Sequence, residues 1–332
     1  MSNKNFENAL KRVNQSIPPI WFMRQAGRYH SHYQKLKEKY TFEQLCKTPD
    51  LAAEVACGPI KEFDFDVAIL FSDILFLLEG LGLGLKFNPG PIFSQYVNKE
   101  NYKNFSNLEY AFNHIGFQAD ALKLTRDMLP QDKSLIGFVG GPWTLLRFAT
   151  GKTKETLKYE DFHMEYMKNV ISPLLKMNIG LQLQSGAEIV MIFDSSLYDL
   201  DSLIFNNQYF ALLKDLTNEF PNKVGYYSRG KEIKELIPVM NLPLAGIGYD
   251  HNILLSDVFL KSNMGFVQGN FDENLMLLNE SDFLLELKSF IHTIKSIENI
   301  NGWVCGLGHG VNKHTPEKNV HLFIENIRKE FG

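Results

Sequence analysis

Residues 18–29 have the sequence Pro18-Pro19-Ile20-Trp21-Phe22-Met23-Arg24-Gln25-Ala26-Gly27-Arg28-Tyr29, an apolar run that ends in two arginines, a glycine and a tyrosine. A short apolar run that begins with prolines predicts a buried strand, so we expect Arg24 and Arg28 in the turn that follows it. Two neighbouring guanidinium groups indicate a site for carboxylate or phosphate, because each can bind such a group with two hydrogen bonds. The same spacing also fits two solvated charges beside a strand.

Short apolar runs recur along the chain, and each ends in glycine or a polar residue. The further expected strands cover residues 66–71, 134–139, 188–193, 223–227, 244–247, 265–267 and 303–307. The first expected helix has Thr48 as its cap and Pro49 in its first turn, and it runs to about residue 63. The others cover residues 107–129, 160–184 with a break near Pro173, 204–220, and the segment from the cap Thr315, with Pro316 at its first position, to about residue 329. A small hairpin or irregular loop is expected over residues 80–91.

This alternation of strands and helices predicts a parallel sheet with helices outside. Counting the opening run there are about eight units, which is the number that closes a barrel. We therefore expect an α/β protein with one domain over residues 1–332, a (β/α)8 TIM barrel with an N-terminal extension. An open doubly wound sheet is the alternative, but Gly306, Gly308 and Gly310 lack the spacing of a dinucleotide-binding loop.

Composition narrows the class of partner. The formal net charge is -4, which argues against a nucleic-acid or anionic-membrane partner, since both require a basic face.

Residues 1–13 lack the apolar core of an export signal, and no apolar run is long enough to span a membrane. Cys46, Cys57 and Cys305 are scattered, so we expect no disulfide framework and a cytoplasmic location.

In a barrel the active-site groups lie where the strands end, so five residues that are distant in sequence are expected to converge. These are Arg24, Arg28, Asp73, Ser195 and His309. Each also has a purely structural interpretation. Asp73 could cap a helix before Ile74, Ser195 could be a cap, and His309 could be a satisfied structural histidine.

The run from Trp21 to Tyr29 resembles the N-terminal signature of the uroporphyrinogen decarboxylase family. Further segments are similar to that family's other landmarks, in the family's order and along nearly the whole chain: Phe71-Ser72-Asp73-Ile74-Leu75, Gly137-Phe138 with Gly141-Pro142-Trp143-Thr144-Leu145, Ile192-Phe193-Asp194-Ser195, Gln268-Gly269-Asn270 and Leu307-Gly308-His309-Gly310.

The resemblance implies a cytoplasmic (β/α)8 barrel, usually a homodimer, that decarboxylates the four acetate side chains of uroporphyrinogen III. The product is coproporphyrinogen III, in haem or other tetrapyrrole biosynthesis, and neither a cofactor nor a metal is expected. The implied partner is the tetrapyrrole substrate. The implied catalytic residues are Asp73, Arg24 and Arg28, and the implied substrate-binding residues are Arg24, Gln25, Ala26, Gly27, Arg28, Asp73, Phe148, Phe193, Ser195 and His309.

Several positions depart from the family's pattern. Arg147-Phe148 stands where the family has a threonine-tyrosine pair, so a hydroxyl is missing there. Arg147 could replace it by binding a substrate carboxylate, or it could be a solvated helix residue. The other departures are His30-Ser31-His32 after the arginine turn, Leu197-Tyr198 after Ser195, and a displaced Asp250.

Two alternatives to the decarboxylase follow. A corrinoid-linked zinc methyltransferase of the same fold would require a clustered thiolate site, and Cys305 near His309 has no second cysteine beside it. A catalytically weakened tetrapyrrole-binding protein is suggested by Phe148 and the other departures.

Overall fold

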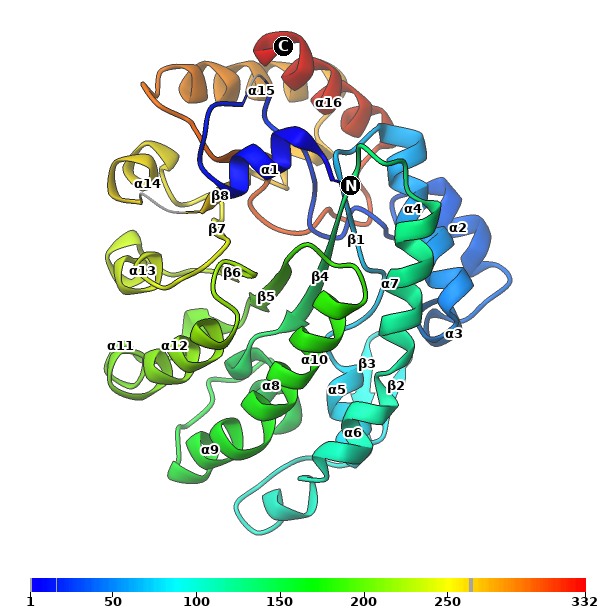
Figure 1. Ribbon diagram of the computed structural model, residues 1–332, viewed down its shortest axis with the longest axis vertical. Helices are drawn as coiled ribbons and strands as arrows, with labels where there is room; N and C mark the ends of the chain where they lie inside the picture. Colours follow the sequence, from blue (N-terminus) through cyan, green and yellow to red (C-terminus); the bar gives the residue numbers. More distant parts are fainter. Residues whose placement is uncertain (1, 16, 263–264) are drawn as a thin grey trace.

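The strands form a ring with the helices outside it (Figure 1). The computed structural model describes residues 2–15, 17–262 and 265–332. Within these residues seven parallel strands pair in the order β1-β4-β5-β6-β7-β8-β9, and β2 and β3 form a separate antiparallel hairpin. The expected α/β barrel is confirmed, as is the small hairpin.

The strands are β1 Val67–Ile69, β2 Leu85–Phe87, β3 Pro91–Phe93, β4 Ser134–Gly140, β5 Val190–Asp194, β6 Val224–Ser228, β7 Gly246–Gly248, β8 Phe266–Phe271 and β9 Trp303–Leu307. The helices are α1 Lys4–Leu10, α2 Ser31–Lys37, α3 Phe42–Lys47, α4 Pro49–Phe63, α5 Phe76–Leu78, α6 Leu108–His114, α7 Phe117–Met128, α8 Pro142–Ala149, α9 Asp161–Tyr166, α10 Ser172–Gln184, α11 Ser202–Ile204, α12 Phe210–Glu219, α13 Ile233–Met240, α14 Leu255–Lys261, α15 Glu280–Lys295 and α16 Glu317–Phe331.

The opening run supplies the missing strand between β9 and β1. On one side, Cys305 donates its N–H to Pro19 O at 2.9 Å and accepts from Trp21 N at 3.3 Å. On the other side, Asp66 N donates to Ile20 O at 3.0 Å, and Ile20 N donates to the Asp66 carboxylate at 2.8 Å. The barrel is therefore closed by eight strand segments, as the alternation of the sequence predicted.

The barrel interior is apolar at its amino end. Alternate strand residues point inward and form an inner core, whose members include Trp21, Met23, Val67, Ile69, Ile136, Met191, Tyr227 and Phe266. Glycines make room for the larger side chains: a Cβ on Gly246 would lie 2.2 Å from Cγ of Phe266. The opposite strand faces pack against the helices in a larger outer core.

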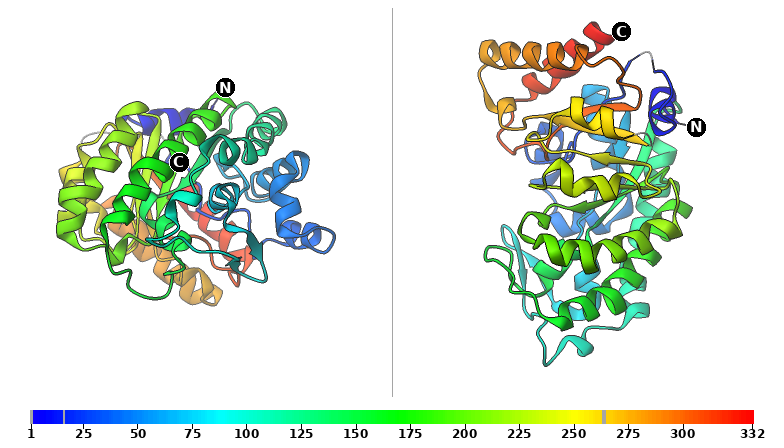
Figure 2. Two further views of the ribbon diagram at one scale, coloured as in Figure 1. Left: turned by 90° about the horizontal axis from the view of Figure 1, so that it is seen from below. Right: turned by 90° about the vertical axis from the view of Figure 1, so that its left-hand side faces the viewer.

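Helix α1 covers the amino end of the barrel. Its residues Phe6 and Ala9 belong to the inner core, and the amide of Asn3 donates to Ser134 Oγ at the start of β4, at 3.0 Å. In the right-hand view of Figure 2, α1 (dark blue) lies at one end of the strands. The expected N-terminal extension therefore blocks one end of the barrel, and the opposite end remains for a site.

Some helix boundaries differ from the expected ones. Residues 107–129 form two helices, because the chain makes tight turns at Ile115 and Gly116 whose amides bond three residues back. A π turn over Met167–Ile171 joins α9 to α10 just before Pro173, close to the expected break. Pro316 and not Thr315 occupies the cap position of α16.

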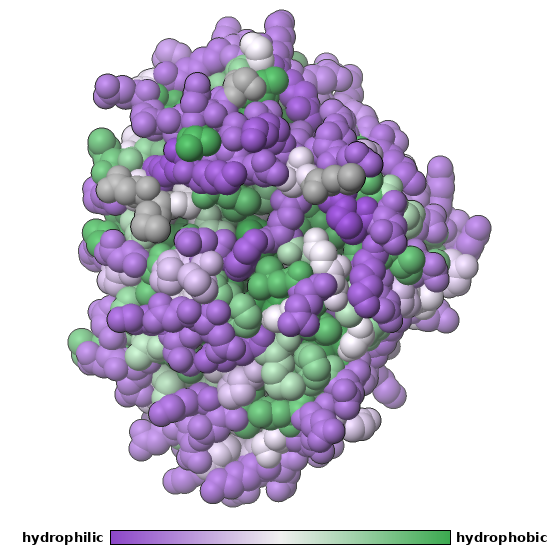
Figure 3. All heavy atoms as spheres, in the orientation of Figure 1, coloured by the Kyte–Doolittle hydropathy of each residue, from purple (hydrophilic) through white to green (hydrophobic). Residues whose placement is uncertain are grey.

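The surface and the cysteines agree with an ordinary globular protein. Cys46, Cys57 and Cys305 are all free and buried, so the expected absence of a disulfide framework is confirmed for these three residues. No helix among the described residues has the length and apolar character needed to cross a bilayer. Most of the face in Figure 3 is hydrophilic, with apolar residues gathered across its middle.

Arg147 links the loops that follow β4 and β5. Its side chain is buried and forms an ion pair of 2.6 Å with Asp199, which also accepts from Trp143 Nε1 at 2.9 Å. The guanidinium donates further to the carbonyl oxygens of Lys152 and Glu155, at 2.8 and 2.7 Å. Both interpretations offered for Arg147, a solvated residue and a substrate-facing cation, were therefore wrong, because its partners lie within the protein.

Asp66 connects the opening run to the rest of the barrel, so its removal should weaken closure. In Asp66→Ala the amide of Ile20, which is fully buried, loses its acceptor, and Arg328 loses a carboxylate at 3.3 Å. We expect the free energy of unfolding, measured in urea, to fall by about 2–4 kcal/mol. The control Asp127→Ala, on the exposed face of α7, should change it by less than about 0.5 kcal/mol; equal effects would contradict this role.

Arg147→Ala should lower the free energy of unfolding by about 3–5 kcal/mol, because it leaves the Asp199 carboxylate buried without its cation. The double variant Arg147→Met with Asp199→Asn should recover part of this loss, since neither group is then charged. Lys154→Ala, an exposed change nearby, is the control. Unchanged stability in Arg147→Ala would mean that this ion pair contributes nothing.

Candidate active site

The strand-end residues lie at the carboxyl end of the barrel, opposite α1. Arg24 and Arg28 follow the closing strand, Asp73 follows β1, Ser195 follows β5 and His309 follows β9. Because all these strands are parallel, their ends meet at one edge. The convergence expected from the sequence is therefore present at the level of the backbone.

Arg24 occupies a backbone conformation that the surrounding contacts impose. Its φ is +63°, in the left-handed region that costs an L-residue about 1–2 kcal/mol. The turn is anchored where Val311 N donates to Met23 O at 2.9 Å. The Arg24 side chain crosses Gly310, where a Cβ would lie 2.5 Å from Arg24 Cδ. Arg24 thus lies beside the loop that carries His309.

Asp73 has both the structural and the chemical features proposed for it. One carboxylate oxygen accepts from Leu75 N at 2.9 Å, so it does hold the following turn, while the other oxygen accepts no hydrogen bond from the described residues. Desolvation raises the pKa of Asp73 to about 6, although the Leu75 N–H and the charge of Arg24 act in the opposite direction. A carboxylate with a free oxygen and a nearby guanidinium remains available to a ligand.

Aromatic rings extend from β4 across the site to His309. The ring centroids of Phe138 and Phe193 are 5.7 Å apart, and those of Phe193 and Tyr227 are 6.2 Å apart. The rings of Tyr227 and His309 are nearly parallel, with centroids 5.9 Å apart. Phe138 and Phe193 are partly exposed, so this row offers an apolar surface on which a flat ring system can pack.

His309 is neutral in this arrangement. Burial, together with the smaller effects of Arg24, Arg229 and His251, lowers its pKa to about 3. Its Nδ1 lies 3.3 Å from the Tyr227 hydroxyl, which donates to Gly308 O at 2.9 Å. Since the single Tyr227 proton is used on Gly308, the geometry favours Nδ1–H as the donor to Tyr227 and leaves Nε2 as an acceptor.

The loop between the two arginines is held by internal hydrogen bonds. The buried Gln25 side chain accepts from Phe22 N at 3.1 Å and donates to Val67 O at 2.9 Å. Its own carbonyl accepts from the Tyr29 hydroxyl at 2.8 Å. The amides of Ala26 and Gly27 donate to no acceptor among the described residues, so the backbone of this loop can bind an anion. The Gln25 side chain already makes two hydrogen bonds within the protein, so it cannot bind the anion at the same time.

Two expected site residues are not joined to this group by any described contact. The hydroxyl of Ser195 makes no hydrogen bond within the described part of the chain, and the neighbouring Ser196 N donates to Thr144 Oγ1 at 3.1 Å. Phe148 lies on α8 and packs against the outer core. Their roles in substrate binding stay predictions.

Two residues of the site were not chosen from the sequence, Tyr227 and Arg229. Both stand at the end of β6, so the rule that identified Asp73 and His309 would have found them. The charge of Arg229 acts on Arg24 and on Tyr227, which places it at the same end of the barrel. Burial raises the pKa of Tyr227, so this phenol stays protonated.

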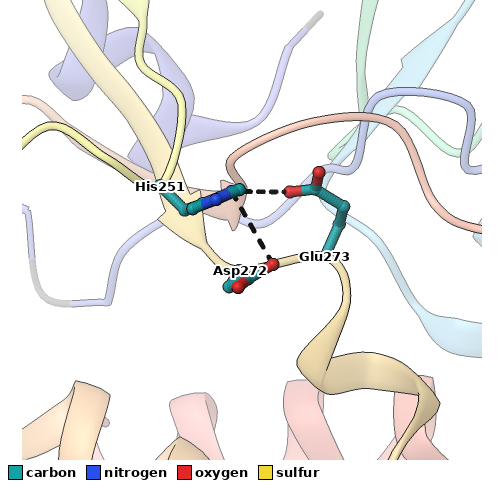
Figure 4. A group of neighbouring side chains, drawn as sticks. All are labelled: His251, Asp272 and Glu273. Atoms are coloured by element: carbon teal, nitrogen blue, oxygen red, sulfur yellow. Dashed lines mark hydrogen bonds and ion pairs between the residues drawn. The ribbon is translucent and has the colours of Figure 1, made fainter. Parts of the chain in front are cut away.

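One group of described residues has the composition of a metal site: His251, Asp272 and Glu273 (Figure 4). It contains no cysteine. Cys305 belongs to the outer core, which lies between the strands and the helices, and burial raises the pKa of its thiol well above the ordinary value. The thiolate site required by the zinc methyltransferase alternative is therefore not formed by Cys305.

Comparison with solved structures supports the architecture. A methyltransferase from Methanosarcina mazei superposes with a TM-score of 0.82 over 99% of each chain, at 14% sequence identity. At this identity the likeness concerns the fold only. It agrees with the barrel described above.

Comparison with sequence families is more specific. The family model described as uroporphyrinogen decarboxylase matches residues 1–330. A uroporphyrinogen decarboxylase of Orientia tsutsugamushi is 35% identical, over 96% of each chain, and one of Neorickettsia sennetsu is 32% identical, over 93% of this chain and 96% of its own length. The resemblance stated from the motifs is thus confirmed over the whole chain, which belongs to the uroporphyrinogen decarboxylase family of carboxy-lyases.

Proposed function

We propose that this chain removes carbon dioxide from the four acetate side chains of uroporphyrinogen III and so forms coproporphyrinogen III in haem or other tetrapyrrole biosynthesis. The observation that carries the proposal is the desolvated Asp73 carboxylate, with one free oxygen, beside Arg24 at the end of the barrel. A tetrapyrrole with carboxylates at its rim and N–H groups at its centre matches cations that surround a carboxylate.

The chemistry requires a place for the electrons of the C–C bond that breaks. A proton adds to the pyrrole carbon beside the acetate-bearing carbon, which makes the ring a cation. Carbon dioxide then leaves, and the bonding electrons move into that cation. A proton added to the exocyclic carbon completes the methyl group, and the first proton is lost. Asp73 would accept the pyrrole N–H groups and stabilise the cation by its fixed negative charge.

The other residues have roles in binding. Arg24 and Arg28 would bind substrate carboxylates and assist proton delivery, and the amides of Ala26 and Gly27 support them. Phe193 would pack against the macrocycle, while Ser195 and His309 would contact side-chain carboxylates. Phe148 would adjoin the substrate where the family has a tyrosine. No metal or cofactor is part of this proposal, and the homodimer, the single domain and the cytoplasmic location stay predictions.

Asp73→Asn should lower kcat/KM by about a hundredfold or more, because it removes the charge that stabilises the cation. In the parent, kcat/KM should fall as the pH drops below about 6, since the carboxyl then becomes protonated. The variant should lack this inflection. Rates measured between pH 5 and 8 would test this. A variant that retains parental activity would contradict the role of Asp73 as the charge that stabilises the cation.

The stability of Asp73→Asn supplies the control. A carboxyl whose folded pKa lies above the unfolded value destabilises the fold as the pH rises through that interval. The parent should therefore lose some stability between about pH 4 and 6. Asn can still accept from Leu75 N, so the variant should be at least as stable as the parent at pH 7, which excludes misfolding as the cause of lost activity.

Arg24→Lys and Arg28→Lys preserve charge but lose the planar fork that binds a carboxylate with two hydrogen bonds. We expect each to lower kcat/KM by about ten- to a hundredfold, the effect of one hydrogen bond to a charged group. Arg126→Lys, near the amino end of β4, is the matched control and should be unaffected. Near-normal kinetics in both test variants would mean that the arginine turn has only a structural role. Tight substrate binding without turnover in the parent would favour the alternative of a catalytically weakened tetrapyrrole-binding protein.

A further inference from the structure

Three polar side chains from successive loops meet beside the site: Arg229 after β6, His251 after β7 and Glu273 after β8. The His251 Nδ1 lies 3.1 Å from one carboxylate oxygen of Glu273, and Arg229 lies 3.9 Å from the other. Figure 4 shows the His251 ring directed toward Glu273 and Asp272, whose Oδ1 lies 3.6 Å from the same Nδ1. The Glu273 carboxylate thus bridges a histidine and an arginine.

Glu273 is buried, while Arg229 is not. The side chain of Glu273 is 7% exposed, whereas that of Arg229 is 45% exposed. A buried carboxylate requires hydrogen-bonding or ionic partners, and Glu273 has the His251 ring at one oxygen and the Arg229 guanidinium at the other. Arg229 has five N–H donors, and none of them makes a hydrogen bond of ordinary length to a described residue. The N–H donors of Arg229 are therefore available to a ligand, while Glu273 attracts the guanidinium from one side.

The backbone around Arg229 is fixed. The amide of Gly230 donates to Asp250 Oδ2 at 2.7 Å, and Asn270 Nδ2 donates to Asp250 O at 2.8 Å. Gly230 has φ +70°, and a Cβ there would lie 2.8 Å from Cβ of Tyr198. These contacts connect the loops after β6 and β7 to strand β8, so they hold the start of the Arg229 side chain in place.

Arg229 is close enough to the site to act on its residues. Its positive charge lowers the pKa of Arg24 and of His309, together with the larger effect of burial on each group. Arg24, Arg28 and Arg229 therefore place three cations at one end of a chain whose net charge is -4. A concentration of cations in an acidic protein suits a ligand with several negative charges.

We propose that Arg229 is a third substrate-binding arginine that takes a rim carboxylate of the tetrapyrrole, and that Glu273 is a positioning residue that orients it, with His251 holding Glu273. This inference rests on the proposed function. The alternative occupant of the group is a divalent cation held by His251, Asp272 and Glu273. The guanidinium next to Glu273 opposes that, because it already supplies positive charge to the carboxylate.

Binding can be measured without turnover by using uroporphyrin, the oxidised and unreactive octacarboxylate, as a fluorescent probe. Arg229→Gln should weaken its binding about ten- to a hundredfold, and Arg229→Lys should weaken it less. In turnover assays KM should rise by a similar factor while kcat stays within about threefold. Parental binding of uroporphyrin by both variants, with an unchanged KM, would overturn the inference.

A double-mutant cycle tests the positioning role. If Glu273 acts through Arg229, Glu273→Gln should weaken probe binding by less than Arg229→Gln does, and the double variant should be no worse than Arg229→Gln alone. Fully additive effects would overturn the positioning role. Titration of the parent with Zn²⁺ alone tests the alternative of a divalent-cation site. Stoichiometric Zn²⁺ binding that Glu273→Gln abolishes would overturn the positioning role of Glu273.

The same assays separate this inference from the proposed function. A parent that binds uroporphyrin but turns over no uroporphyrinogen refutes the proposed reaction, and the binding data still decide the role of Arg229. A parent that is active, with Arg24→Lys impaired and Arg229→Gln unimpaired, refutes only the third arginine. Urea unfolding of each variant identifies any loss that is due to folding.

Discussion

The pairing of the opening run with β1 and β9 is the constraint on which both the fold and the site depend. Ile20 exchanges two hydrogen bonds with Asp66, one to its backbone and one to its carboxylate, and Cys305 bonds the same run from the other side. The next residues of that run are the arginines. The step that closes the barrel therefore also brings Arg24 beside Asp73 and His309, which lie 49 and 285 positions further along the chain.

Patterns that depend on neighbouring residues were predicted well from the sequence. Strand β9 has the predicted bounds, α4 begins at the predicted Pro49, and the strand-end rule placed Arg24, Asp73 and His309 at one end of the barrel because it requires only that the strands be parallel. Features with distant partners could not be predicted in this way. Arginine is typical of exposed helix positions, and only the ion pair with Asp199, 52 positions later, explains why Arg147 is buried.

The electrostatics of the site explain why its cations are spread over several loops. Burial keeps His309 neutral and makes ionisation of Asp73 harder, so the arginines at this end are the charges on which a polyanion can depend. Arg24 and Arg28 come from one turn, and Arg229 from a loop beyond Tyr227. Carboxylates on the rim of a wide ring are far apart, so cations that hold several of them must also come from separate loops.

Substrate binding has a consequence for Asp73 that follows from the same charges. In the free protein, Arg24 is the charge that opposes the effect of burial on the Asp73 carboxyl. When Arg24 binds a substrate carboxylate, its positive charge is neutralised and its support for the Asp73 charge decreases. Hydrogen bonds from the pyrrole N–H groups have to replace that support, since donors to the charged form favour it. Under the proposed function, a ligand that supplies both the rim carboxylates and the central N–H groups preserves the Asp73 charge better than one that supplies carboxylates alone, so the specificity of binding and the readiness for catalysis depend on the same pair of residues.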